Sequence, residues 1–341
     1  MPRRPAHDLV TIDDALGWQE RFCLDLGAPR SAEMLAGVRT GLDRLDGMLP
    51  AVVRSGDLLG LRVLAALNRL LRTGQVPAVA DLVEQDALGT GNPDRRARLH
   101  EAVVDALEAH PDVLAEALAR VPQTNEPGRA GPLRVALSLA DRPVRLHEVG
   151  ASAGLNLRAD HLPGVSDLER GPLPEVTVRA GCDRHPIDAT TPEGQAQLEA
   201  FVWIDHAERL AALRAACAVA AAVPADVVTA DATDFVSGLT LAQGAITVLW
   251  HSAFWEYLDA DAAIALTEAI GRLAREATME GPFWQVGWEQ HRSGDDFALT
   301  ITAWDGRPGG PVRAEALAGS AHGAALRALP ALSDLPGQLS R

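Results

Sequence analysis

A short glycine-bearing segment carries the residues best suited to bind a small molecule. Glu148–Asn156 (EVGASAGLN) overlaps the end of the apolar run Val144–Val149 and contains two glycines in the spacing E-x-G-x-x-x-G. A glycine turn lets the backbone approach a ligand closely, and the start of a following helix favours polar or anionic groups. This pattern predicts a nucleotide-binding loop. Its cofactor-binding candidates are Glu148, Gly150, Ala151, Ser152, Gly154 and Asn156.

The same residues allow a second chemistry. Gly150 to Gly154 also reads G-x-S-x-G, which would make Ser152 a hydrolase nucleophile with His251 or His291 as its base. A hydrolase of that fold needs several strands before the nucleophile turn, and an oxyanion loop upstream. Here the run before the turn is the first strand signal after about 140 helical residues, which favours nucleotide binding. A tight turn without a ligand is the third interpretation.

Acidic residues follow the next strand signals. An acid at the end of the second strand is expected to accept hydrogen bonds from a ribose. Asp183, after Val176–Ala180, is our first choice, and Asp205, after Phe201–Ile204, is the alternative. Asp231, after Val227–Ala230, is placed where methyltransferases commonly meet the adenine amino group. Capping a helix N-terminus is the competing role for such aspartates.

Two further segments supply candidates for chemistry and substrate contact. Ala245–Trp250 predicts a fourth strand, and His251 follows it. A histidine titrates near neutrality and can act as a general base for an oxygen or nitrogen nucleophile, although it can equally cap a helix or bond a buried carbonyl. The substrate-contact candidates are Trp250, Trp255, Asn125 and Arg129. Core packing is the alternative for the tryptophans, and a polar connector is the alternative for the other two.

Strand and helix signals that must position these residues predict an α/β fold. Residues 1–142 read as a helical region, 143–305 as a Rossmann-like domain and 306–341 as a loosely held tail rich in Gly, Ala and Pro. Alternating strands and helices imply a mostly parallel sheet with helices on both faces. Phe283–Trp288 and Phe297–Trp304 have only the turn Arg292–Asp296 between them, which indicates an antiparallel edge. Ser152–Asp160 reads as a helix start.

Composition excludes several classes of function. All 31 basic residues of the 341 are Arg, so Schiff-base, Walker-type and kinase-type lysine chemistry is excluded. The net charge of −15 argues against a nucleic acid and favours a small-molecule substrate. Cys23, Cys182 and Cys217 form no CxxC pair, so we expect no metal site of cysteines. Without a signal peptide or membrane-span pattern, we expect a cytoplasmic protein. Nothing indicates the oligomeric state.

Five motifs in combination resemble a known family: Gln123–Arg129, Glu148–Asn156, Gly181–Asp188, Val202–Arg209 and Trp250-His251-Ser252. From about residue 50 to 305, the chain is similar to the bacterial family catalogued as domain of unknown function 2332. Many members carry Asn where this chain has His185, and Pro where it has Ile204. The predicted fold of that family is similar to class I methyltransferases. The resemblance therefore implies that fold and its cofactor, S-adenosylmethionine, and no substrate.

Three functional hypotheses follow. The first is an S-adenosylmethionine-dependent methyltransferase with a class I, Rossmann-like sheet, acting on an unknown small molecule. The second is a serine hydrolase that uses Ser152. The third is a non-catalytic protein that keeps the fold to bind a partner, because a fold alone does not establish an activity.

Overall fold

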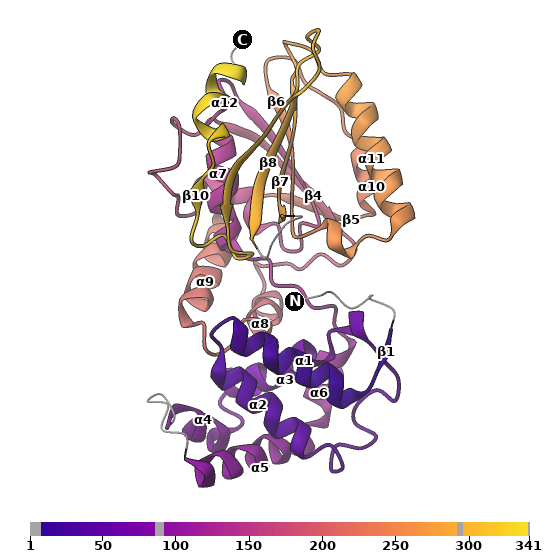
Figure 1. Cartoon of the computed structure of the whole chain (residues 1–341), viewed down its shortest axis with the longest axis vertical. Helices are drawn as coiled ribbons and strands as arrows, with labels where there is room; N and C mark the ends of the chain where they lie inside the picture. Colours follow the sequence, from indigo (N-terminus) through magenta and orange to yellow (C-terminus); the bar gives the residue numbers. More distant parts are fainter. Residues whose placement is uncertain (1–7, 86–91, 292–295, 340–341) are drawn as a thin grey trace. The chain divides into compact units, whose positions relative to one another are not determined.

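The computed structural model describes residues 8–85, 92–291 and 296–339, which divide into two compact units (Figure 1). One unit comprises the described residues up to Thr124 together with Gln195–Ala211. The other comprises Asn125–Gly194 and the described residues from Ala212 onward. We expected the boundary near residue 142 and placed 195–211 with the sheet. Phe201 and Trp203 instead lie in the apolar core of the helical unit, which explains why their segment belongs there.

The first unit is a helical bundle, as its apolar periodicity predicts. Pro29, Pro77, Pro93 and Pro111 each begin a helix, where the missing N–H of proline costs nothing. Its elements are β1 (Leu9–Val10), α1 (Ile12–Asp25), α2 (Pro29–Thr40), β2 (Val53–Arg54), η1 (Ser55–Asp57), α3 (Leu59–Arg72), α4 (Pro77–Glu84), α5 (Pro93–Ala109), α6 (Pro111–Ala119), most of α8 (Pro192–Ala200) and the start of α9 (Ala207–Ala222).

The second unit is built on a sheet of eight described strands in the order β10-β9-β8-β7-β6-β3-β4-β5. Neighbours from β5 to β7 pair in parallel, and β8, β9 and β10 continue the sheet antiparallel. The strands are β3 (Val144–Val149), β4 (Val176–Asp183), β5 (Asp226–Thr229), β6 (Ile246–Ser252), β7 (Phe283–Gln290), β8 (Phe297–Trp304), β9 (Val312–Gly319) and β10 (Arg327–Ala328). The mostly parallel sheet with an antiparallel edge is confirmed.

Helices cover both faces of this sheet (Figure 1). Val149 and Leu249 share one apolar cluster with residues of α10 and α11, whereas α7 packs on the opposite face. The helical elements are η2 (Pro127–Arg129), α7 (Ala130–Leu137), η3 (Leu155–His161), the remainder of α9, α10 (Ala232–Ser237), η4 (Trp255–Tyr257), α11 (Ala260–Arg275) and α12 (Ala331–Leu339). In the parts of the chain that the structure describes, no helix has the length and apolarity needed to cross a membrane.

The strand order creates a switch point between β3 and β6. From β3 the chain proceeds outward to β4 and β5, then returns to β6 on the other side of β3 and continues to β7. Open α/β sheets bind ligands in the crevice at the carboxyl ends of two such strands. Glu148 and Trp250 are register partners across this pair, so the segments that follow them meet at that edge.

The C-terminal segment departs from our expectation of a loosely held tail. β9 pairs with β8 along its length, and Leu332 and Leu335 of α12 are fully buried. Gly and Pro cluster at 306–311, whereas Val312–Gly319 is a strand whose last four residues are buried. We missed this strand because we judged residues 306–341 by their average content of Gly, Ala and Pro. The expected turn at Arg292–Asp296 lies largely outside the described residues, but the antiparallel pairing of β7 with β8 is confirmed.

Candidate functional site

The loop after β3 is a succession of left-handed turns. Gly150, Ser152 and Gly154 have φ values of 69°, 52° and 65°. Such a backbone is easy for glycine and strained for serine. The chain then enters the short 3-10 helix η3, and the α-helix that we expected over Ser152–Asp160 does not form. Repeated left-handed residues interrupt the hydrogen-bond ladder that a regular helix needs.

Backbone N–H groups of this loop bind the protein itself. The contacts are Ala151 to the Cys182 carbonyl at 2.9 Å, Ser152 to Oδ2 of Asp183 at 2.8 Å and Leu155 to Oδ1 of Asn125 at 3.0 Å. These bonds fix the loop against β4 and against the segment before η2. Three N–H groups of the loop are therefore already used, and a ligand here would depend on side chains more than on a row of free N–H groups.

Glycine is required in this loop by neighbouring side chains. A Cβ on Gly150 would come within 2.5 Å of the Phe254 ring, and one on Gly154 within 2.7 Å of Cγ2 of Val227. We expected both glycines to leave room for a ligand. At Gly154 the neighbour is protein, so its small size serves packing. At Gly150, which is exposed, the space is covered by a ring from the segment after β6.

Glu148 is the most unusual polar residue of the site. Its side chain is 1% exposed, and its Oε2 has no hydrogen-bond partner among the described residues. Burial raises the pKa of Glu148 well above its usual range; Arg129 and Arg158 act in the opposite direction, and Asp183 adds to the rise. Oδ1 of Asn156, another buried acceptor of the loop, also lacks a partner in the described parts. Buried acceptors without donors indicate a place for a water molecule or a ligand.

Asp183 lies at the last position of β4, which runs three residues beyond the expected Val176–Ala180. Its Oδ2 accepts the Ser152 N–H and its Oδ1 accepts the His185 N–H, both at 2.8 Å. Asp183 therefore joins the glycine loop to the segment after β4. This places it at the carboxyl edge of the sheet, beside the loop, as expected for the ribose-binding acid.

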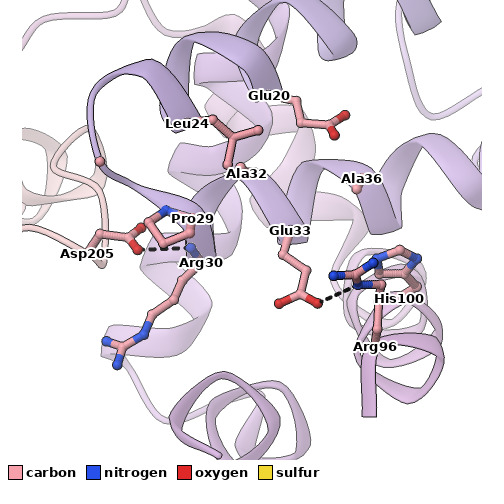
Figure 2. A pocket seen from close by; sticks show the side chains of 11 residues that line it. Glu20, Leu24, Pro29, Arg30, Ala32, Glu33, Ala36, Arg96, His100 and Asp205 are labelled. Carbon is pink, nitrogen blue, oxygen red and sulfur yellow. Dashed lines mark hydrogen bonds and ion pairs between the residues drawn. The ribbon is translucent and has the colours of Figure 1, made fainter. Parts of the chain in front are cut away.

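Asp205, the alternative acid, lies in the helical unit. Its carboxylate accepts the N–H groups of Arg30 and Ser31 at 2.9 Å and the Ser31 hydroxyl at 2.7 Å, which caps the start of α2. Figure 2 shows Asp205 beside Pro29 and Arg30, at a cavity of about 730 Å³ lined mainly by α1, α2 and α5. Asp205 thus ends no strand of the sheet, and Asp183 remains the candidate.

Asp231 fills the competing role of a helix cap. Its side chain accepts the Thr233 N–H at 2.9 Å and pairs with Arg184 at 2.7 Å. The ion pair with Arg184 lowers the pKa of Asp231, and the bond from Thr233 does the same. Asp231 still stands at the carboxyl end of the sheet, directly beyond β5, but its carboxylate already stabilises α10.

Arg129 and Asn125 contact the edges of the site. Nε of Arg129 donates to the Ala321 carbonyl at 3.0 Å, and Nη1 donates to the Ser252 carbonyl at 3.2 Å, so Arg129 joins the β9–β10 connection to the end of β6. Burial lowers the pKa of this guanidinium. Asn125 has a positive φ of 29° and supports Leu155 of the loop. Arg129 can meet an anionic ligand group, whereas the amide oxygen of Asn125 is a structural support.

His251 lies inside β6 and its side chain is 3% exposed. Nδ1 lies 2.8 Å from Oε1 of Glu289, and Nε2 lies 3.4 Å from Nε1 of Trp255 and 3.2 Å from Nε2 of Gln285. Both ring nitrogens are therefore engaged by β7 and by the segment after β6. For the hydrolase hypothesis, Nε2 of His251 would have to accept the Ser152 hydroxyl proton, and in this conformation Trp255 and Gln285 occupy that nitrogen. The other candidate base, His291, pairs with Glu315 at 3.3 Å.

The two candidate tryptophans have different environments. Trp250 is fully buried in β6, and its Nε1 has no partner in the described structure. It is a core residue and cannot form the wall of a pocket, contrary to one of our expectations. Trp255 is half-buried in η4 and packs edge-on against His251, with ring centroids 5.7 Å apart. Of the two candidate tryptophans, Trp255 is thus the one with an accessible surface.

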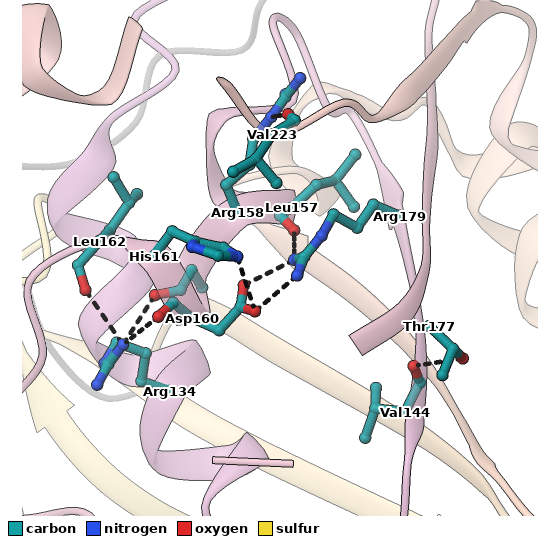
Figure 3. A network of polar contacts seen from close by, with 11 residues as sticks. Arg134, Val144, Leu157, Arg158, Asp160, His161, Leu162, Thr177, Arg179 and Val223 are labelled. Atoms are coloured by element: carbon teal, nitrogen blue, oxygen red, sulfur yellow. Dashed lines mark hydrogen bonds and ion pairs between the residues drawn. The ribbon is translucent and has the colours of Figure 1, made fainter. Parts of the chain in front are cut away.

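An arginine network binds backbone carbonyls in and around η3 (Figure 3). Arg158 donates to the Gly154 carbonyl at 2.7 Å and to the Val223 carbonyl at 2.9 Å. Arg179 binds the Asp160 carboxylate through two contacts of 2.6 Å and also the Leu157 carbonyl. The carbonyls of η3 that no regular helix satisfies thus receive guanidinium donors, which a planar fork supplies better than an ammonium.

Sequence reasoning did not identify Glu289, Gln285 or Arg158. Every second position of β7 from Gln285 onward, namely Gln285, Gly287 and Glu289, lies on the same face of the sheet. Polar residues at alternate positions of an otherwise apolar strand are a signal that the sequence itself contains. Their meeting with His251 depends on the pairing of His251 with Gly287, which only the register reveals. No comparable local pattern marks Arg158.

Comparisons with known proteins give a family and one distant structure. A search of curated proteins finds no match. A crystal structure of a S-adenosylmethionine-dependent methyltransferase from Clostridium acetobutylicum ATCC 824 matches with a TM-score of 0.23 and 10% identity, over 69% of this chain and 85% of that chain. At this similarity no residue of that enzyme can be equated with a residue of the loop. The family model covers residues 13–327, so the chain belongs to the family described as "Uncharacterized protein conserved in bacteria (DUF2332)".

Proposed function

We propose that this protein binds S-adenosylmethionine at the switch point between β3 and β6 and methylates a small molecule. The observation that carries the proposal is the buried carboxyl of Glu148, which directly precedes the glycine turn and has an Oε2 without a partner in the described structure. A buried acceptor left unsatisfied costs about 1–3 kcal/mol. A ligand that donates a hydrogen bond to Glu148 would remove this cost.

Residues of the site match the charges of the cofactor. Glu148 would accept a hydrogen bond from its ammonium group, whose positive charge would favour the ionised carboxyl that burial alone disfavours. The half-buried guanidinium of Arg129 would meet its carboxylate. A carboxylate can accept about four hydrogen bonds. Asp183 can therefore accept bonds from ribose hydroxyls while it keeps its bonds from the N–H groups of Ser152 and His185. When bound, the cofactor supplies a methyl group on a sulfonium that leaves as a neutral thioether. His251 would take the proton of the methyl acceptor.

Phe254 sets a condition for binding. Its ring stands where a side chain on Gly150 would be, so it covers the glycine turn. We expect this ring to move when the cofactor enters. Ala253, just before it, has a strained φ of 47°, which makes this segment a natural place for a change of backbone conformation.

Calorimetry with S-adenosylhomocysteine tests the proposal. We expect binding by the unmodified protein, and affinity about tenfold to a hundredfold lower in Asp183→Ala, because a hydrogen bond to a charged group contributes about 1.5–3 kcal/mol. Asp205→Ala is the matched control, since that aspartate caps α2 in the helical unit. Absence of binding at millimolar ligand, or a larger effect of Asp205→Ala, would contradict the proposal.

A labelling experiment separates the proposal from the hydrolase hypothesis. We expect a fluorophosphonate probe to leave Ser152 unlabelled, because Trp255 and Gln285 occupy Nε2 of His251, the nitrogen that would have to activate the Ser152 hydroxyl. Stoichiometric labelling at Ser152 would make the protein a serine hydrolase. Neither labelling nor cofactor binding would leave a partner-binding protein.

A further inference from the structure

We propose that the methyl acceptor is a planar aromatic or heteroaromatic molecule with an acidic O–H or ring N–H, and that the Trp255 indole occupies its place on His251 in the free protein. This inference rests on the proposed methyltransferase function. It is carried by the contacts around His251, which the cofactor site does not require.

The contacts determine which nitrogen of His251 carries the proton. The indole Nε1 of Trp255 is a donor only, so Nε2 of His251, 3.4 Å away, must accept. The proton of a neutral imidazole is then on Nδ1, which donates to Oε1 of Glu289 at 2.8 Å. The lone pair of His251 is therefore on Nε2, the form that a general base needs, and it faces the indole N–H of Trp255 and the side-chain amide of Gln285 at 3.2 Å.

Glu289 is the positioning residue of this pair. Its two carboxylate oxygens also accept the Phe254 N–H, at 3.1 and 3.2 Å, which holds the carboxylate in place. Gly287 provides the room for the ring, since a Cβ there would lie 2.4 Å from Cε1 of His251. A carboxylate on Nδ1 maintains the tautomer and stabilises the imidazolium that forms when Nε2 takes a proton.

Trp255 behaves as an internal analogue of the acceptor. Its ring meets the His251 ring edge-on at 90°, and the Phe254 ring lies 6.2 Å from it, centroid to centroid, at an interplanar angle of 72°. A flat ring with a hydrogen-bond donor is what this position accommodates. Trp255 belongs to the short helix η4, next to Tyr257, which is 68% exposed. The indole lies at the margin of the apolar cluster on this face of the sheet, half-buried and outside its fully buried part, so we expect it to be displaceable by an acceptor.

The transfer balances with these groups. The acceptor O–H or N–H gives its proton to Nε2 of His251, and the electron pair left on oxygen or nitrogen forms the new bond to the methyl carbon. The bound cofactor would supply the methyl group, and its sulfur would keep the electron pair of the carbon–sulfur bond. The imidazolium, paired with Glu289, then returns its proton to solvent.

Phenol binding by a Trp255→Ala variant, without cofactor, tests the inference. Removing the indole leaves a ring-sized space beside Nε2 of His251. We expect phenol to bind about threefold to tenfold more tightly than anisole, because only phenol donates a hydrogen bond. We also expect phenol to bind more tightly than cyclohexanol and to shift the His251 ring resonances in ¹⁵N NMR. Trp304→Ala, which removes a half-buried tryptophan stacked on Phe283, is the control and should not distinguish phenol from anisole.

Equal affinity for phenol and anisole, or for phenol and cyclohexanol, would overturn the inference. Trp255→Phe, which keeps a ring and loses the N–H, provides a second test that does not depend on a cavity. Its Nε2 resonance should shift because one of two donors is lost and only Gln285 remains, while Nδ1 stays protonated. A proton on Nε2 would overturn the inference. A third outcome is possible: Trp255→Ala prefers phenol, but the unmodified protein does not bind S-adenosylhomocysteine. That result would reject the proposed methyltransferase function and keep only a site at His251 for an aromatic hydrogen-bond donor.

Discussion

His147 and Glu148 are adjacent in β3 and both are buried, but one is a core residue and the other lies at the candidate site. Strand alternation directs Glu148 and His147 to opposite faces of the sheet. His147 is 3% exposed, packs near Phe235, and neither ring nitrogen has a partner among the described residues. Burial lowers the pKa of His147 to about 4, with a smaller contribution from Arg145. His147 is therefore a neutral core residue, whereas Glu148 lies at the candidate site.

Replacement of His147 by leucine, which has a similar volume, should stabilise the protein in acid. The unfolded state binds a proton near pH 6.5 and the folded state only near pH 4, so stability from this group is present above 6.5 and is lost as the pH falls toward 4. At pH 5 the loss amounts to about 2 kcal/mol. Urea unfolding at pH 5 and pH 8 should show His147→Leu gaining most at pH 5. An equal gain at both values would contradict the neutral, buried histidine.

At the scale of elements, the loop between β3 and η3 is held by its neighbours on every side. β4 supplies Asp183, the segment before η2 supplies Asn125, and η3 returns Arg158 to the loop carbonyls. β5 contributes Val227, whose side chain stands against Gly154. The loop conformation therefore depends on the packing of several elements, and the glycines permit it.

Gly154→Ala should destabilise the fold, because the new Cβ would lie 2.7 Å from Val227 at a φ of +65°. The left-handed backbone and the overpacking together should cost about 2–4 kcal/mol. Val227→Ala in the same chain should restore part of this loss, with a coupling free energy of about 1 kcal/mol or more in a double-mutant cycle by chemical denaturation. Strictly additive effects would mean that Val227 is not the obstacle.

At the scale of the whole molecule, the C-terminal segment completes the sheet unit. β9 lies between β8 and β10, and the connection that follows it reaches Arg129 through the Ala321 carbonyl. Gly128 and Gly323 permit the close approach there, since a Cβ on Gly323 would lie 2.1 Å from the Gly128 carbonyl oxygen. The last part of the chain thus contributes to the candidate site as well as to the core.

Leu335→Ala should lower the free energy of unfolding of the full chain by about 2–5 kcal/mol, the cost of truncating a fully buried leucine. Ser333→Ala, on the exposed side of the same helix α12, is the matched control and should change it by less than about 0.5 kcal/mol. Thermal or denaturant unfolding measures both. If the two variants behave alike, α12 does not pack as the structure shows.

Local features of the sequence were sufficient to predict the strands from β3 to β8 and the glycine turn, but not β9, β10 or α12. Val144–Val149 is a strand with the bounds we expected. The structure also has three other features that the sequence predicted: the glycine turn, the acid at the end of β4 and the antiparallel pairing of β7 with β8. These features depend on the periodicity of apolar residues along the chain and on the backbone conformations that glycine permits. Both are set by residues close together in the sequence. The helical character of the first unit is readable for the same reason.

Long-range packing decided which partner each polar side chain has. Asp205 caps α2 from a position 174 residues away from Ser31, and His251 meets Glu289 across 38 residues. Gly154 must be small because of Val227, and the apolar residues of β9 enter the sheet despite a Gly- and Pro-rich approach. A side chain binds the donor or acceptor that strand register and helix packing bring within about 3 Å, and no local pattern contains that information.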